Sequence, residues 1–177
     1  MNEFQILANS HAQRFVLRVE KWVQENVFSD FKVTAKFDWN PSRRSSRGGI
    51  YKDGPGINMA MYWAMPNNKG TTYKFNEYSS FDADPHIGGF YSTRPEDKLE
   101  AILAHEIAHA VQFFAYKKLN IKCKPHGPVF KKYYKMLRQQ FVNPNLPEQL
   151  PLKKDYQSYV NNLQSINVMM LSRLLGA

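Results

Sequence analysis

The first 28 residues carry apolar side chains at roughly every third or fourth position, a spacing that places them on one face of a helix. We therefore predict a helix from residue 3 to about residue 28. Its apolar face comprises Leu7, Phe15, Val19, Trp22 and Val23, with Phe4 and Val16 adjoining. This face is expected to pack against the rest of the protein.

Strict alternation of apolar and polar residues follows in "FKVTAKFDW", residues 31–39, and predicts a half-buried strand. After a basic, turn-rich connection at 40–49, "IYKDGPGINMAMYW" predicts two short strands around a turn at 53–56. Together these segments predict a small antiparallel sheet. Its inner residues would be Phe31, Val33, Ala35, Phe37 and Trp39, and then Ile57, Met59, Met61 and Trp63.

Residues 65 to 92 show no regular pattern, because turn-forming and aromatic residues are mixed within them. A short strand near Tyr73 to Phe75 is the one element that this stretch suggests. We therefore expect a long loop or an insertion here. A connection of this length without clear structure is often functional rather than passive.

A second helix is predicted by "STRPEDKLEAILAHEIAHAVQFFAYKKLN", residues 92–120. Thr93 can cap it, Pro95 suits the first turn, and Glu96 stands three residues after Thr93, as a capping box requires. A wide apolar face follows, made of Leu99, Ile102, Leu103, Ala110, Phe113 and Phe114.

Two further helices are predicted, over residues 128 to 142 and about 153 to 175. The first is amphipathic, with Lys131, Lys135 and Arg138 outward and with Phe130, Tyr133, Tyr134, Leu137 and Phe141 inward. Helices around a small antiparallel sheet indicate the α+β class. A length of 177 residues suits one domain over residues 1–177, in which 143–177 form a C-terminal helical extension.

Composition narrows the class of protein. Apolar residues make up 43% of the chain and aromatic residues 14%, which excludes an intrinsically disordered chain. Cys123 is the single cysteine, so an internal disulfide and a cysteine-based zinc knuckle are both excluded. The N-terminus lacks the pattern of a signal peptide, and no window approaches the ~20 apolar residues of a membrane span. We expect a soluble protein in the cytoplasm or associated with a nucleoid or nucleus, and not a secreted one.

The most informative stretch is "ILAHEIAHAVQFFA", residues 102–115, because it contains the pattern H-E-x-x-H within a predicted helix. His105 and His109 lie one helical turn apart, so their imidazoles can meet a single zinc ion. Glu106 is placed to take a proton from a water molecule rather than to bind the metal. The alternative is a chance occurrence of this pattern in a core helix.

A catalytic zinc ion needs a third protein ligand. The metzincin pattern requires Gly and His where this chain has Gln112 and Ala115, so that pattern is excluded. A carboxylate from a following helix is poorly supported, because no Asp or Glu occurs between Glu106 and Glu148. Histidine is the natural candidate, and the sequence offers His126, His86 and His11.

The order of these motifs resembles the SprT-like domain of the SprT and Spartan metalloproteases. The resemblance spans roughly residues 5–142 and lies in "FKVTAKFDW" with the segment after it, "LEAILAHEIAHAVQ" and "PHGPVFKKYY". In that family a helix and a three-stranded sheet precede H-E-x-x-H, and a third histidine follows in an H-G-x-x-F context. Here this context is His126, Gly127 and Phe130.

The resemblance implies a zincin-like fold, with His105, His109 and His126 as zinc ligands and Glu106 as general base. It also implies that a substrate segment runs along an exposed strand, for which residues 57–63 are the candidate. Relatives often carry a C-terminal zinc ribbon with four cysteines, which the single cysteine of this sequence does not provide.

Basic residues exceed acidic ones by 24 to 15, giving a net charge of +9 that favours polyanionic partners. Tyr51 and Tyr62 could stack on unpaired bases. The alternative is that the aromatic residues are core and the lysines merely solvated. We predict non-sequence-specific DNA binding through Lys117, Lys118, Lys131, Lys132, Lys135 and Arg138, together with a second basic loop at Arg43, Arg44 and Arg47.

The sequence therefore predicts a zinc-dependent metalloprotease that acts on DNA-associated or DNA-crosslinked proteins. One rival hypothesis is a catalytically inactive, zinc-stabilised module for DNA binding or adaptor function. Another is a metalloprotease whose basic surface meets an acidic protein instead of DNA.

Overall fold

The structure of the chain is a computed structural model that describes residues 1–64, 73–77, 84–92, 94–120 and 123–146. The helix predicted over about 153 to 175 lies outside these residues. Within the described ranges, no helix combines the length and hydropathy needed to cross a membrane.

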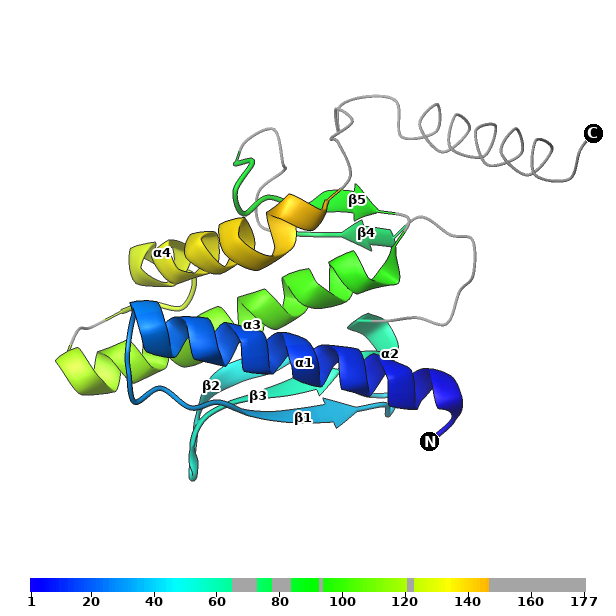
Figure 1. The fold of residues 1–177 in the computed structure, drawn as a ribbon, viewed down its shortest axis with the longest axis horizontal. Helices are drawn as coiled ribbons and strands as arrows, with labels where there is room; N and C mark the ends of the chain where they lie inside the picture. Colours follow the sequence, from blue (N-terminus) through cyan, green and yellow to red (C-terminus); the bar gives the residue numbers. More distant parts are fainter. Residues whose placement is uncertain (65–72, 78–83, 93, 121–122, 147–177) are drawn as a thin grey trace, which may run out of the picture.

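Helices and a small sheet alternate along the chain, which confirms the α+β class (Figure 1). The elements are α1 (Glu3–Asn26), β1 (Thr34–Asp38), β2 (Arg47–Tyr51), β3 (Gly54–Ala60), α2 (Met61–Ala64), β4 (Tyr73–Phe75), β5 (Phe90–Ser92), α3 (Pro95–Leu119), α4 (Pro128–Leu137), the π turn η1 (Arg138–Val142) and the 3-10 turn η2 (Asn143–Asn145).

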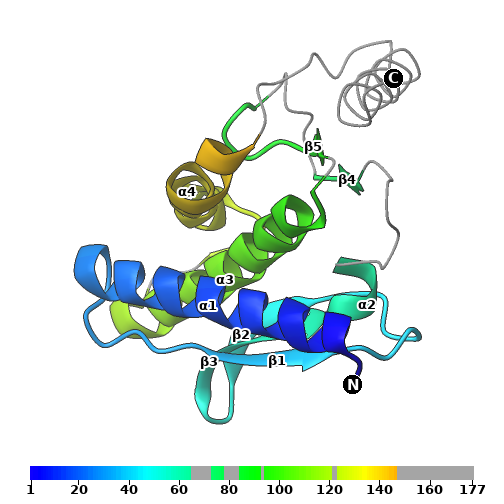
Figure 2. The same ribbon diagram turned by 45° about the vertical axis from the view of Figure 1, so that its right-hand side comes forward.

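Helix α3 lies at the centre of the molecule. In both views α1 and α3 lie on one face of the sheet β1–β3, and α4 and the pair β4–β5 lie beyond α3 (Figures 1 and 2). The small side chains of Ala101, Ala104 and Ala108 are fully buried and allow close approach on more than one side. The N-cap residue of α3 is Arg94, without a side-chain cap, and Pro95 stands at the first helical position. The predicted capping box depends on Thr93, which lies outside the described residues.

Helix α1 confirms the first predicted helix. Its N-terminus is closed by a capping box in which Asn2 accepts from the backbone N–H of Gln5. Phe15, Val19 and Val23 are buried as predicted. Leu7 is not: it is 62% exposed, and the small residues Ala8 and Ala12 provide the inner contacts of this part of the helix.

The three-stranded sheet has the order β1–β3–β2. Strands β2 and β3 form the predicted antiparallel hairpin, but β1 and β3 are parallel, so the prediction of an antiparallel sheet is wrong for this pair. The buried residues Ile57 and Met59 make β3 the most apolar strand, and it occupies the centre of the sheet. It therefore separates β1 from β2 and pairs with β1, with Ile57 opposite Ala35 and Met59 opposite Phe37. The chain turns into helix α2 after β3, which leaves Trp63 45% exposed instead of on the predicted inner face.

The stretch from 65 to 92 contains the predicted strand as β4. This strand pairs antiparallel with β5, which the sequence did not suggest, and Phe75 lies opposite Phe90. These two rings are 5.3 Å apart between centroids, and both side chains are buried. The stretch therefore contributes to the core as well as to the surface.

Helix α4 confirms the predicted helix after residue 127, with Phe130, Tyr134 and Leu137 buried. Arg138 contradicts its predicted outward position, because its relative exposure is 0%. It stands four residues after Tyr134, a spacing that places both side chains on the inner face of the helix.

Strand β2 approaches α3 more closely than any side chain would allow. A Cβ atom built on Gly48 would stand 1.8 Å from the backbone oxygen of Glu106. A Cβ on the adjacent Gly49 would meet only the ring of Phe113, at 3.7 Å or more. Glycine at position 48 is therefore a steric requirement for this packing.

We expect Gly48→Ala to destabilise the protein by about 3 kcal/mol or more, because the clash is with backbone that cannot rotate away. Gly49→Ala is the matched control, and its effect should stay within about 1 kcal/mol. Urea unfolding of both variants measures the difference. Equal stability of the two variants would show that β2 does not rest on α3 in this way.

Candidate metal centre

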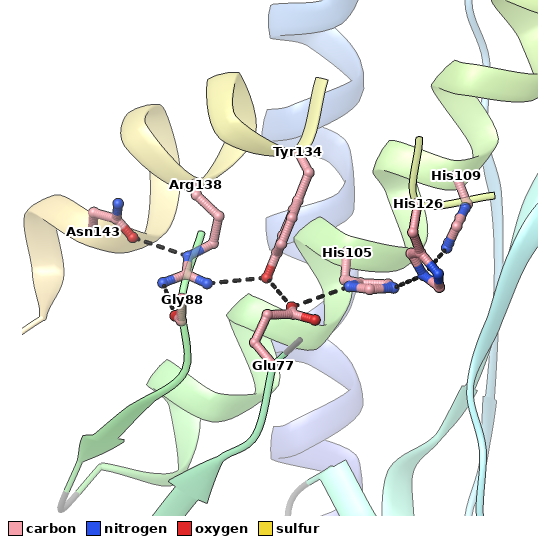
Figure 3. A network of polar contacts seen from close by, with 8 residues as sticks. All are labelled: Glu77, Gly88, His105, His109, His126, Tyr134, Arg138 and Asn143. Atoms are coloured by element: carbon pink, nitrogen blue, oxygen red, sulfur yellow. Dashed lines mark hydrogen bonds and ion pairs between the residues drawn. The ribbon is translucent and has the colours of Figure 1, made fainter. Parts of the chain in front are cut away.

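Three histidines converge at the middle of α3. His105 and His109 come from α3, and His126 comes from the turn that precedes α4. His126 Nε2 lies 3.1 Å from His105 Nε2 and 3.0 Å from His109 Nε2, and Figure 3 shows the three rings facing one another. One ligand atom from each of the three lies within 4.8 Å of the others.

The two competing histidines lie elsewhere. His11 Nε2 is 3.0 Å from Glu100 Oε1, on the contact between α1 and α3. His86 Nδ1 is 3.0 Å from Gln139 Nε2 in η1, the turn that follows α4. Of the three candidates left open by spacing, the structure brings only His126 to the pair on α3.

The backbone at His126 is adapted to this placement. Its φ of 57° lies in the left-handed region, which costs a residue other than glycine about 1–3 kcal/mol. The turn is closed by Gly127 N–H, which donates to Lys124 O at 3.0 Å. Gln112 of α3 also donates to Lys124 O, at 2.8 Å, so the turn is fastened to the helix that carries the other two histidines.

The donor set fits a metal ion better than it fits hydrogen bonding alone. His126 Nε2 faces two imidazole nitrogens, and one hydrogen atom can be shared with only one of them. Zinc–nitrogen bonds of about 2.0–2.1 Å in a tetrahedral site place neighbouring nitrogens about 3.3–3.4 Å apart. The observed separations are close to that, so these three histidines could hold a metal ion.

The outer nitrogens of the two helix histidines each face an oxygen atom. His105 Nδ1 is 3.2 Å from Glu77 Oε2, and His109 Nδ1 is 3.3 Å from Gln112 Oε1. Because both oxygens accept, each Nδ1 carries the hydrogen and each Nε2 presents its lone pair to the centre. Neither Glu77 nor Gln112 was among the predicted site residues, although Gln112 stands one turn after His109.

Burial favours the neutral, metal-binding form of these side chains. It lowers the pKa of His109 from 6.5 to about 4, with repulsion from His105 and His126 adding to the effect. Burial also lowers the pKa of His126, as does the neighbouring His105. Both residues are therefore neutral, and able to donate a lone pair, at neutral pH.

Glu106 is a buried carboxylate beside this centre, with a relative exposure of 9%. Burial raises its pKa, while His105 and a backbone hydrogen bond from Gly48 oppose that shift. A carboxylate with a raised pKa is a stronger base than an exposed one. Gly48 of β2 thus holds the side chain of Glu106, the residue that we predicted to transfer a proton.

The candidate substrate strand at 57–63 is wrong. Strand β3 is hydrogen-bonded on both sides, to β1 and to β2, and residues 61–63 belong to α2. The strand at the edge of the sheet beside α3 is β2, the one that contacts Glu106 at Gly48.

The basic residues predicted to bind DNA differ in exposure and in their ion pairs. Lys118 pairs with Asp30, and Arg43 lies 3.5 Å from Asp38 and is half-buried. Arg138 is fully buried and leaves the predicted surface. Lys135 is half-buried, while the exposed members are Lys117, Lys118, Lys131, Lys132, Arg44 and Arg47. Tyr51 and Tyr62 are exposed, as base stacking would require.

His105 and His109 lie one helical turn apart on α3, and His126 joins them from the turn before α4. On this α+β fold the three histidines could hold a metal ion. The family model described as SprT-like matches residues 88–153, a segment that contains all three histidines and Glu106. This match agrees with the SprT-like resemblance noted in the sequence. Comparisons with curated proteins and with solved structures gave no match.

We expect the wild-type protein to bind one zinc ion per chain. His126→Ala should lower the affinity for zinc more than about 100-fold, because losing a ligand costs more than losing a residue that only supports a ligand. His86→Ala is the matched control and should keep the wild-type affinity. Zinc content and chelator competition on the purified proteins measure both. Full zinc retention by the His126 variant would refute the assignment of this ligand.

Proposed function

We propose that the protein is a zinc-dependent peptidase that hydrolyses peptide bonds of DNA-associated proteins. The observation that supports it is the pairing of three converging histidines with a buried carboxylate next to them in the chain. A catalytically inactive, zinc-stabilised DNA-binding or adaptor module is the alternative. It would keep the histidines without needing Glu106 as a base.

His105, His109 and His126 would hold the ion through Nε2. When bound, zinc supplies Lewis acidity that activates water and polarises a carbonyl group. Glu106 accepts a proton from the attacking water, and the water oxygen forms a bond to the carbonyl carbon. Glu106 then delivers the proton to the amide nitrogen as the carbon–nitrogen bond breaks, which leaves a carboxyl product and an amine. The raised pKa of Glu106 suits both proton transfers.

Strand β2 is the proposed support for the substrate backbone. It lies at the edge of the sheet beside α3, and Gly48 and Gly49 bring no side chains between the strand and the helix. An extended peptide can add to such an edge by main-chain hydrogen bonds. This placement would bring the peptide close to Glu106.

We expect Glu106→Gln to lower peptide-bond cleavage about 10²–10⁴-fold, the usual contribution of a general base. Zinc content should not fall, because the carboxylate is not one of the converging ligand atoms. Cleavage of a DNA-bound protein is followed with and without single-stranded DNA. Glu96→Gln, the same substitution in the first turn of α3, is the control and should cleave normally.

Absence of cleavage by the wild-type protein, under every metal and DNA condition, would sink the peptidase proposal. Equal cleavage by wild type and the Glu106 variant would remove Glu106 from the reaction.

The DNA part of the proposal is supported by the lysines near the third histidine. Lys124, Lys131 and Lys132 are exposed and lie within six residues of His126 in the chain. Lysines placed in this way can contact phosphates without reading a base sequence. A substrate protein attached to the DNA would then be held beside the metal centre.

Reversal of Lys124, Lys131 and Lys132 to Glu should weaken binding of single-stranded DNA. It should also flatten the dependence of log K on log salt by about 0.7 for each phosphate that the protein no longer neutralises. The matched control reverses Lys21 of α1, Lys32 just before β1 and Lys36 of β1, which are all exposed and change the net charge equally. Fluorescence anisotropy across a salt series provides the measurement.

Equally weakened DNA binding in both variants would indicate an effect of net charge alone. A wild-type protein that binds an acidic protein but not DNA would favour a metalloprotease whose basic surface meets an acidic protein.

A further inference from the structure

A chain of polar side chains runs from the histidine centre to the π turn after α4 (Figure 3). His105 Nδ1 is 3.2 Å from Glu77 Oε2, Tyr134 Oη donates to the same oxygen at 2.8 Å, and Arg138 Nη1 donates to Tyr134 Oη at 3.0 Å. We propose that Glu77 is a positioning residue for His105, held in place by Tyr134 and Arg138. This inference rests on the proposed metal centre and adds a residue outside the matched SprT-like segment.

The environment of Glu77 requires an explanation, because its side chain is only 6% exposed. A carboxylate removed from water is costly unless donors replace the lost hydration. Here His105 and Tyr134 both approach Oε2, and the guanidinium of Arg138 lies one side chain further along. The carboxylate is thus stabilised by groups that also fix its direction.

The consequence for His105 is a single ring orientation and a single tautomer. A charged acceptor at Nδ1 holds the hydrogen there, which leaves the Nε2 lone pair directed at His126. The ring is also confined by Phe130 and Tyr134, whose centroids are 4.9 and 5.1 Å from that of the imidazole. A metal ligand held by a carboxylate is more basic and loses less freedom when the ion binds.

Arg138 holds the segment that carries Glu77 against the end of α4. Its Nη2 donates to Gly88 O at 3.2 Å, and its Nε donates to Asn143 Oδ1 at 2.9 Å. The guanidinium also lies 5.2 Å from the ring centroid of Phe90 and 5.8 Å from that of Phe75. One buried cation therefore joins α4 to both strands of the β4–β5 pair, and Glu77 follows Phe75 by two residues.

The two helix histidines consequently differ in their support. His109 is held by Gln112, a neutral amide from the same helix, whereas His105 is held by a carboxylate from a distant part of the chain. Of the acceptors that the structure describes at Nδ1 of His105 and His109, Glu77 is the charged one.

The test compares Glu77→Ala, Glu77→Gln and Tyr134→Phe with Gln139→Ala. The control Gln139→Ala breaks a contact between His86 and η1, and leaves the hydrogen bonds from Arg138 to His105 in place. Chelator competition gives the zinc dissociation constant of each full-length protein, and the absorption spectrum of the cobalt-loaded protein reports the ligand field. We expect Glu77→Ala to weaken zinc binding about 10–100-fold and to shift the cobalt bands. Glu77→Gln keeps an oxygen acceptor but loses its charge, so zinc binding should weaken less in this variant.

The outcomes separate this inference from the proposal beneath it. A wild-type protein that binds no metal through the histidines would remove the centre and Glu77's role together. Wild-type affinity and an unchanged cobalt spectrum in both Glu77 variants would overturn the positioning role alone. Equally weakened zinc binding in Glu77→Gln and Gln139→Ala would show that only attachment of the stretch matters, which also overturns it. Should Glu77→Ala fail to fold, the near-isosteric Glu77→Gln and Tyr134→Phe decide the question by the same readouts.

Discussion

The structure depends on the burial of α3, a helix covered on several sides that nevertheless carries polar side chains into the interior. A buried polar group is tolerated only where it finds a partner. The partners come from different surrounding elements, so burial of the helix ties those elements to it. Asp97 bonds Ser92, Glu100 meets His11, Glu106 meets Gly48, His105 meets Glu77, and Gln112 bonds Lys124 O.

This arrangement places the chemistry of the candidate site where several elements meet α3. The sheet reaches Glu106 through Gly48, the β4–β5 stretch reaches His105 through Glu77, and the turn before α4 supplies His126. Each approach sets one property: the basicity of the carboxylate, the orientation of a ligand, and the closure of the donor set. The left-handed backbone conformation of His126 is strained, and the hydrogen bond from Gln112 to Lys124 O helps to hold it.

Periodicity predicted the elements that have one buried face, and it failed where tertiary contacts decide. Helices α1, α3 and α4, strand β1 and the β2–β3 hairpin followed from spacing, as did the pairing of His105 with His109. The parallel contact of β1 with β3 did not, because strand order depends on which strand buries most. Glu77 lies in a stretch without a period, so no local pattern could connect it to His105. Arg138 was assigned outward from its charge, although its spacing from Tyr134 indicated the inner face.

The central claim is that His105, His109 and His126 hold one metal ion through their Nε2 atoms. X-ray absorption at the zinc edge of the loaded protein tests it most directly, because the spectrum reports the type and number of ligands. We predict three imidazole nitrogens and one oxygen ligand at about 2.0–2.1 Å. A sulfur ligand at about 2.3 Å, which would have to come from Cys123, the single cysteine, would contradict it. A site with only two imidazole ligands would contradict it as well.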